Sequence, residues 1–292
     1  MAIKNVFVVG GGLMGGGIAQ VCACAGLKVR ICDVAQGALD KALKNIAWSA
    51  GKMVEKGKVP GTLDEIMARI SAGTDMAAAA QADLVIEAVY ENLELKRDIF
   101  KKIDEAASAQ ALLASNTSAI SITELAACTK RPDKVFGLHF FNPVPMMQAV
   151  EVIRGYATSE ETFEAGRQFA LAVGKEPIMV RRDVGGFIIN RVRFMLYMEA
   201  MRLVENGITT VDDVDKGLCL AEGRKMGVFE TGDLVGLDVS HGAMNAIYEE
   251  TKDPRWYPPE ILRRKVKLGE LGRKTGKGWY LYDKDGKKLG PA

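Results

Sequence analysis

Histidine, cysteine and net charge are all scarce in this chain, and each shortage excludes a class of protein. The 292 residues include two histidines and five cysteines, without a CxxC pair. We therefore expect reduced core cysteines, and neither a metal site nor a disulfide framework. The 39 basic and 37 acidic residues leave a net charge of +2, which gives no overall field that would favour nucleic acid or a membrane surface.

Long hydrophobic runs and a leader segment are also missing. No apolar stretch approaches the roughly 20 residues needed to span a bilayer. The first expected strand begins at Lys4, which leaves no room for a signal or transit peptide. We therefore expect a protein of the reducing cytoplasm, with neither a membrane nor a nucleic-acid partner.

The pattern of the first half is typical of a wound, mostly parallel sheet. Short β-branched runs alternate with helical patterns, and the expected strands are Lys4–Val9, Lys28–Cys32, Leu84–Ala88, Leu112–Ser115, Val135–His139, Ala149–Ile153 and Ile178–Val180. After Gly185 and Gly186 the pattern becomes helical, with expected helices at Phe187–Asn206, Val211–Leu220, Gly232–Glu250 and Pro259–Leu271. We predict an α/β domain over residues 1–184 and an all-helical domain over residues 185–292.

One connection in the first domain is too long for a simple crossover. Between the second and third expected strands, Gln36–Lys58 and Gly61–Ile70 both have helical patterns. We predict an inserted helical hairpin over residues 36–70, and insertions of this kind usually serve a ligand or a partner.

A glycine turn follows the first strand and opens a helix. In Gly10-Gly11-Gly12-Leu13-Met14-Gly15 the first glycine permits the tight turn, the second lets backbone approach a pyrophosphate, and the third allows close helix packing. Asp33 ends the second strand, where its carboxylate can accept the ribose hydroxyls of an adenosine. This order predicts a Rossmann-type dinucleotide site. The acid favours NAD over NADP, although nearby Arg30 leaves NADP open, and an ordinary strand-end aspartate is the alternative interpretation of Asp33.

The chemistry-bearing residues follow later strands. Ser115–Ser118 come directly after one strand and His139 ends the next, so both should reach the ligand edge of the sheet. An imidazole titrates near working pH and can take the proton of an alcohol, while Glu151 on the following segment can orient it. A structural strand-end histidine is the alternative. His241 has no comparable acid and we interpret it as structural.

Several spaced motifs together resemble the 3-hydroxyacyl-CoA dehydrogenase family, most closely its stand-alone bacterial 3-hydroxybutyryl-CoA dehydrogenases. The resemblance covers essentially the whole chain, and its motifs are Gly10–Gly15, Ser115–Ser118, His139–Pro145, Gly186–Arg191 and Lys274–Gly278. It implies an NAD-dependent oxidoreductase that interconverts a short L-3-hydroxyacyl-CoA, such as 3-hydroxybutyryl-CoA, and the 3-ketoacyl-CoA. It also implies a homodimer formed by the second domain.

The resemblance also implies roles for individual residues. His139 is the catalytic base and Glu151 its partner, and the implied substrate contacts Ser118 and Asn190 lie in different domains. Implied contacts to NAD are Gly10, Gly12, Leu13, Met14, Gly15, Asp33, Glu91, Lys96, Asn142 and Lys274, and implied contacts to coenzyme A are Ser49 and Lys56. Outside the resemblance, Glu91 and Lys96 are ordinary helix-start charges, and the lysines near Ser49 are a solvated face.

The chain departs from the family at Lys225-Met226-Gly227-Val228, where the family often has Pro-Met-Gly-Pro, so acyl-chain preference does not transfer with the resemblance. Two other functions stay open. The site could act on a free hydroxy acid or sugar acid, which the lysines of the hairpin disfavour. The chain could also be a structural relative without turnover, as some lens crystallins are; against this stand intact Ser118, His139, Glu151 and Asn190.

Overall fold

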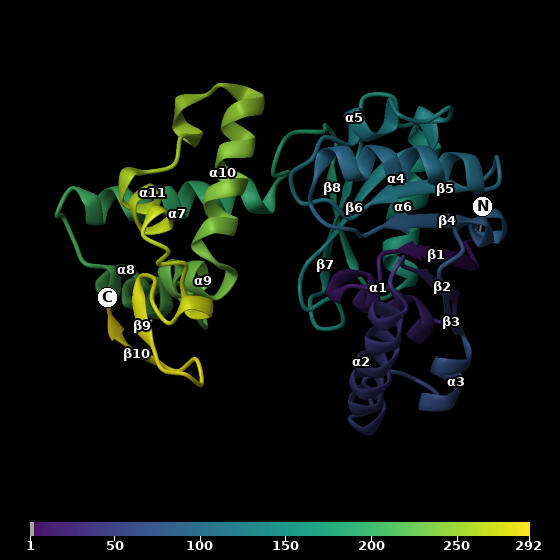
Figure 1. Ribbon diagram of the computed structural model, residues 1–292, viewed down its shortest axis with the longest axis horizontal. Coiled ribbons are helices and arrows are strands. Elements are labelled where there is room, and N and C mark those ends of the chain that lie inside the picture. The colour runs from purple at the N-terminus through teal and green to yellow at the C-terminus, as the bar shows by residue number, and fades with distance from the viewer. Residues whose placement is uncertain (1–2) are drawn as a thin grey trace. The chain divides into compact units, whose positions relative to one another are not determined.

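The computed structural model describes residues 3–292, which form two compact units, one up to Phe187 and the other from Ile188 to Ala292. The first unit is an α/β domain and the second is mainly helical (Figure 1). The predicted fold class, a mostly parallel sheet followed by a helical region, is confirmed. Among the described residues, no helix combines the length and the apolar character needed to cross a membrane.

The first unit is built on an eight-stranded sheet with the order β3-β2-β1-β4-β5-β6-β7-β8. All neighbouring strands are parallel except β6 and β7, which are antiparallel. The strands are β1 (Asn5–Val9), β2 (Lys28–Cys32), β3 (Ile70–Gly73), β4 (Leu84–Glu87), β5 (Leu112–Ser115), β6 (Val135–Phe140), β7 (Ala149–Ile153) and β8 (Glu176–Val180). In such a sheet, ligands bind at the edge formed by the carboxyl ends of the parallel strands.

Helices cover both faces of this sheet (Figure 1). On β1, Val6 and Val8 pack into one core with α1 (Leu13–Cys24), α2 (Gln36–Glu55), α3 (Leu63–Ala68) and α6 (Glu160–Ala172). Phe7 and Val9 pack into a second core with η1 (Met76–Gln81), α4 (Leu93–Ala106) and α5 (Ile122–Ala126). A short 3-10 turn, η2 (Pro132–Lys134), precedes β6. Burial on both faces explains why the strand sequences are almost continuously apolar.

The long connection between β2 and β4 contains a strand that the helical pattern did not predict. Helices α2 and α3 lie within the expected hairpin, and Thr62 with Glu65 forms a reciprocal capping box at the start of α3. Ile70, the expected end of the second helix, instead begins β3 and pairs in parallel with Val29 of β2. Pairing with the open side of β2 satisfies backbone groups that four residues alone could not satisfy, so tertiary context decides the structure here.

The second unit begins with α7 (Ile189–Glu205) and α8 (Val211–Glu222). The single helix expected over Gly232–Glu250 is wrong, because α9 (Val228–Val235) ends at Gly236 and α10 (Leu237–Thr251) begins there. Gly236 has φ +108°, outside the helical region and accessible chiefly to glycine. The unit continues with η3 (Pro254–Trp256), α11 (Glu260–Lys267), η4 (Arg273–Thr275), β9 (Tyr280–Tyr282) and β10 (Lys288–Pro291).

Two buried carboxylates attach the small β9–β10 hairpin, which the sequence did not indicate, to the helices. Asp233 of α9 accepts hydrogen bonds from the backbone N–H groups of Trp279 and Tyr280 at 2.9 Å and from the hydroxyl of Tyr282 at 3.0 Å. Asp215 of α8 accepts a hydrogen bond from the hydroxyl of Tyr280 at 3.0 Å. Burial raises the pKa of both carboxyl groups. We infer a structural role for both, because their oxygens are committed to these bonds.

Candidate active site

Three of the four glycines in the turn after β1 differ in their surroundings. Gly10 has φ +112°, and a Cβ atom there would lie 2.5 Å from the carbonyl oxygen of Ala88. A Cβ atom on Gly15 would overlap the carbonyl oxygen of Gly10. Around Gly12, by contrast, a Cβ atom would meet no heavy atom within 4 Å. The outer two glycines therefore shape the turn, and Gly12 keeps backbone open to a ligand.

Helix α1 presents an uncapped N-terminus at this turn. Its N-cap residue, Gly12, provides no side-chain cap, and its first turn carries no acid. Its backbone N–H groups and the positive end of the helix dipole thus suit the phosphates of a dinucleotide. Leu13, 70% exposed, is the first residue of this helix. A small phosphate group can approach the backbone here without displacing an acidic side chain.

Asp33 lies beside the turn, directly after β2. Its carboxylate accepts hydrogen bonds from the backbone N–H groups of Gly11 at 2.7 Å and Ala35 at 2.9 Å. A carboxylate has about four acceptor positions, so two remain for ribose hydroxyls. Val34 beside it is 95% exposed. An open apolar side chain next to a hydroxyl acceptor fits the adenosine half of NAD.

His139 and Glu151 form a buried pair at the end of β6. They face each other in the antiparallel register of β6 and β7, and His139 Nδ1 lies 2.7 Å from Glu151 Oε2. The side chains are 6% and 0% exposed. Because a carboxylate only accepts, Nδ1 carries the hydrogen, and in the neutral ring Nε2 is then the acceptor. The pair is thus arranged as a base whose reactive nitrogen is Nε2.

Two phenylalanine rings flank the imidazole. The ring centroids of Phe141 and Phe187 lie 4.6 Å and 5.7 Å from that of His139. Phe187 is 1% exposed and has φ +48°, which is uncommon for a residue other than glycine. The backbone after Gly186 is thereby held in the conformation that brings this ring to the imidazole. Both rings restrict how the imidazole can rotate.

Glu91 organises the turn that carries Ser118. Its Oε1 atom accepts three hydrogen bonds: from Thr117 Oγ1 at 2.6 Å, from the Ser118 N–H at 2.8 Å and from the Ala119 N–H at 3.0 Å. Glu91 and Ser118, both predicted from the sequence, are therefore neighbours in the structure. The position of the Ser118 backbone depends on the Glu91 carboxylate.

Asn116 joins this turn to the strand that carries His139. Its side-chain oxygen accepts a hydrogen bond from the Phe140 N–H at 2.9 Å, and its own N–H donates to the Glu87 carbonyl at 2.8 Å. The carboxyl ends of β4, β5 and β6 are thus connected through one amide residue. Asn116 was not predicted as a separate functional residue, although its polar side chain directly after an apolar strand was the signal.

Lys96 is buried at the end of β4. Its Nζ lies 2.5 Å from Glu87 Oε1, and the two side chains are 1% and 0% exposed. Glu87 also accepts from Ser115 Oγ at 2.6 Å and from the Val89 N–H at 2.7 Å. Lys96 was expected near the cofactor. Its charge is neutralised by the carboxylate of Glu87 at the end of β4. Glu87 was not predicted as a site residue because it lies inside the otherwise apolar expected strand Leu84–Ala88.

The remaining predicted residues are dispersed. Ser49 accepts a hydrogen bond from Gln20 Nε2 at 3.0 Å, and exposed Lys56 follows α2 as its C-cap. Asn142 is exposed after β6. In the second unit, half-buried Asn190 lies in the first turn of α7, and Lys274 binds the Asp238 carboxylate at 2.6 Å and 2.8 Å.

Comparison with known proteins assigns both units. The description "3-hydroxyacyl-CoA dehydrogenase, NAD binding domain" matches residues 5–184, and "3-hydroxyacyl-CoA dehydrogenase, C-terminal domain" matches residues 186–282. A 3-hydroxybutyryl-CoA dehydrogenase from Clostridioides difficile is 40% identical over 278 residues, which cover 95% of this chain and 99% of that protein. A mitochondrial hydroxyacyl-coenzyme A dehydrogenase from Mus musculus is 41% identical over 288 residues, 96% and 91% of the two chains.

A solved structure agrees with these relatives. The crystal structure of an (S)-3-hydroxybutyryl-CoA dehydrogenase from Ralstonia eutropha has a TM-score of 0.93 and 39% identity to this chain. The match covers 97% of this chain and all of the other. With the glycine turn, Asp33 and the matched NAD binding domain in agreement, the chain belongs to the 3-hydroxyacyl-CoA dehydrogenase family, whose cofactor is NAD.

Proposed function

We propose that this protein is an NAD-dependent oxidoreductase that interconverts L-3-hydroxyacyl-CoA and 3-ketoacyl-CoA, with a preference for short chains such as 3-hydroxybutyryl-CoA. The observation that carries the proposal is the 2.7 Å contact between His139 Nδ1 and Glu151 Oε2, which leaves Nε2 as the basic nitrogen. Family membership supports the cofactor and the substrate class.

The proposed reaction moves a hydride and a proton away from C3 and its hydroxyl. A bound NAD would supply the acceptor for the hydride of C3 of the substrate. His139 Nε2 takes the proton of the C3 hydroxyl as the C3–O double bond forms, and it returns that proton in the opposite direction. Glu151 accepts the Nδ1 hydrogen throughout, keeps the ring in the correct tautomer and stabilises the imidazolium. Protons and electrons therefore balance without a further reactant.

Ser118 and Asn190 are proposed to hold the substrate. A hydroxyl and an amide can donate to the C3 oxygen and the thioester carbonyl without adding a competing charge. The three hydrogen bonds that Glu91 accepts support this role for Ser118, because they fix the turn on which it lies.

Some of the proposed NAD contacts are supported by the geometry of the site, and others by the family resemblance alone. Gly10, Gly12, Gly15 and Asp33 rest on the geometry of the turn and the carboxylate, and Leu13 and Met14 on their place in the first turn of α1. The family resemblance alone supports direct contacts from Glu91, Lys96, Asn142 and Lys274. For Lys96, burial against Glu87 favours support of the loop after β4 over direct binding.

Coenzyme A is proposed to bind along α2 through Ser49 and Lys56. Trp48 supports this location because it is 71% exposed and lies between Lys44 and Lys52, one helical turn away on either side. Aromatic rings stack on purine bases and lysines attract phosphates. The other two tryptophans, Trp256 and Trp279, are each 2% exposed. Quenching of the fluorescence of exposed tryptophan by 3′,5′-ADP therefore measures contact with Trp48. The Trp48→Phe variant should show no such quenching.

We further infer a homodimer formed by the second unit and a reducing, cytoplasmic environment. The second unit has large exposed apolar side chains on several helices, namely Val192, Leu220, Leu234, Val239 and Leu268. The cysteines are all free thiols, and burial raises the pKa of Cys22. Sedimentation at micromolar concentration tests the dimer, and a purely monomeric species would contradict it.

The deciding experiment is steady-state oxidation of NADH by acetoacetyl-CoA. Replacing His139 by Gln should lower kcat by about 10²-fold or more, since general base catalysis contributes 10²–10⁴, while the Kd for NADH stays the same. His241→Gln, in α10, is the matched control and should keep wild-type turnover. Near-normal kcat in His139→Gln would reject the mechanism. Parallel assays with NADPH, free acetoacetate and longer acyl chains test the cofactor, the thioester and the chain length.

A further inference from the structure

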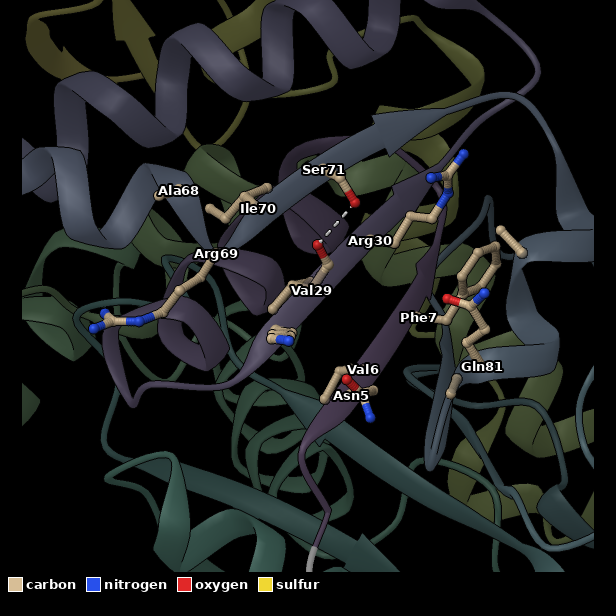
Figure 2. A pocket seen from close by; sticks show the side chains of 13 residues that line it. Asn5, Val6, Phe7, Val29, Arg30, Ala68, Arg69, Ile70, Ser71 and Gln81 are labelled. Carbon is tan, nitrogen blue, oxygen red and sulfur yellow. Dashed lines mark hydrogen bonds between the residues drawn. The ribbon is translucent and has the colours of Figure 1, made fainter.

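A groove lies over the amino-terminal halves of β1, β2 and β3, away from the glycine turn that follows the carboxyl end of β1. Figure 2 shows its lining, which encloses about 400 Å³. The strand residues that line it are the first three of β1 and of β2, together with Ile70 and Ser71 of β3. Because the proposed cofactor and substrate residues follow the opposite strand ends, the groove is a separate feature.

The sheet register puts two polar side chains, Arg30 and Ser71, side by side across this groove. Phe7 pairs with Arg30 and Arg30 pairs with Ser71, so these three side chains share one face of the sheet. Helices α4 and α5 cover that face over β4 and β5, while next to the groove η1 contributes only Ala78 and Gln81. The outer strands therefore present a cation where an ordinary doubly wound sheet would present apolar side chains to a helix.

Arg30 lacks a partner in the part of the chain that the structure describes. Its Nε atom is buried without a hydrogen bond, and none of the ion pairs among the described residues includes its guanidinium. Two acids near Cys32 of the same strand make other bonds: Asp33 accepts from the Gly11 N–H and Asp75 from the Ala77 N–H. A buried donor without an acceptor costs free energy. Arg30 lines the groove, and an oxygen anion there would give this unpaired cation a counter-charge.

Gly73 gives the guanidinium its space. A Cβ atom on Gly73 would lie 2.7 Å from Arg30 Nη2. The charged residues in the lining are all basic, namely Lys28, Arg30 and Arg69, and Asn5, Ser71 and Gln81 add neutral polar groups. Of the two arginines, Arg69 donates to the Ala23 carbonyl at 3.1 Å and its guanidinium points away from Arg30 (Figure 2). Of the two arginines, Arg30 is thus the one that remains available for a ligand.

We propose that this groove is a binding site for a small organic oxyanion, a carboxylate or phosphate ester, whose charged group pairs with Arg30 and Lys28 and whose apolar part lies against Ala78 and Ala82. A planar guanidinium binds two oxygens of such a group side by side. A volume of about 400 Å³ is within the range of small-molecule sites.

The test is calorimetric titration of the full chain with phenyl phosphate, benzoate and neutral benzamide at constant ionic strength. The wild-type protein should bind at least one of the two anions and bind benzamide at least tenfold more weakly. The stronger anion identifies the oxyanion class. Equal binding of benzamide, or no heat with either anion at millimolar concentration, would overturn the proposal.

Variants locate the site. Arg30→Gln should weaken the bound anion roughly tenfold or more, because charge-assisted hydrogen bonds are lost. Gly73→Ala should weaken it as well, since it displaces the guanidinium but keeps the charge, and it provides an independent test if Arg30→Gln folds poorly. Arg167→Gln removes the same charge from α6, where Arg167 pairs with Glu164, and should bind as the wild type does. Unchanged affinity in both groove variants would refute the site.

Discussion

Replacing Lys96 by methionine should destabilise the first unit strongly. The variant keeps most of the side-chain volume but removes the ammonium that lies 2.5 Å from Glu87 Oε1, and both side chains are at most 1% exposed. Breaking a buried ion pair from one side costs about 3–5 kcal/mol, because the remaining charge has no compensation. Glu87 keeps its bonds from Ser115 Oγ and the Val89 N–H, so we expect the lower end, about 3 kcal/mol.

Thermal unfolding followed by calorimetry measures the effect. For a unit of this size, about 3 kcal/mol corresponds to a Tm lower by roughly 6–12 °C. The double variant Lys96→Met/Glu87→Gln should recover most of this loss, because it also removes the isolated carboxylate. The Kd for NADH, measured at temperatures below the unfolding transition, shows whether Lys96 also contacts the cofactor. If the ammonium only neutralises Glu87, this Kd changes by less than about threefold. A Tm within about 2 °C of wild type in the single variant would refute the reasoning.

Three further variants test other parts of the molecule. Glu151→Gln should lower kcat by about 10²–10⁴-fold, because an amide can hold the wrong imidazole tautomer, and unchanged turnover would show that the carboxylate is dispensable. Gly15→Ala should abolish NADH binding because its Cβ overlaps backbone, whereas Gly16→Ala, with its closest contact at 3.8 Å, should bind normally; equal binding would contradict the assigned turn. Hydrogen bonds from two lysine side chains lower the pKa of Glu270 below its usual 4.5, so its stabilising effect is complete above that value and is lost as the pH falls through the lowered pKa. Glu270→Gln should therefore reduce Tm at pH 7 and have a smaller effect at pH 3, and an equal effect at both would reject this linkage.

Local patterns predicted the framework well. Strands of the parallel sheet are buried on both faces, so their apolar runs stand out, and the glycine turn has steric demands that few other sequences meet. Placing His139 and Glu151 on consecutive extended segments already indicated a pair, and the antiparallel register brings them face to face. These features depend on residues close together in the sequence.

Features that depend on distant residues were missed. Residues 70–73 form β3 because β2 offers an open edge, and nothing in their own pattern requires it. Lys96 looks like a surface charge of an amphipathic helix, and only the arrival of Glu87 beneath it explains its burial. The break at Gly236 depends on packing around it, where Lys274 and Asp238 lie close to the glycine. Tertiary context outweighed local propensity in all three cases.

The reversal of direction at β7 has a consequence for how this fold can diversify. Since antiparallel neighbours need only a short connection, the base and its carboxylate lie twelve positions apart in one continuous piece of chain. Their separation is fixed by the ladder of backbone hydrogen bonds, and no helical crossover has to be positioned first. Insertions elsewhere, such as the segment that holds α2 and α3, can therefore change in length or charge while the proton-transfer pair keeps its spacing.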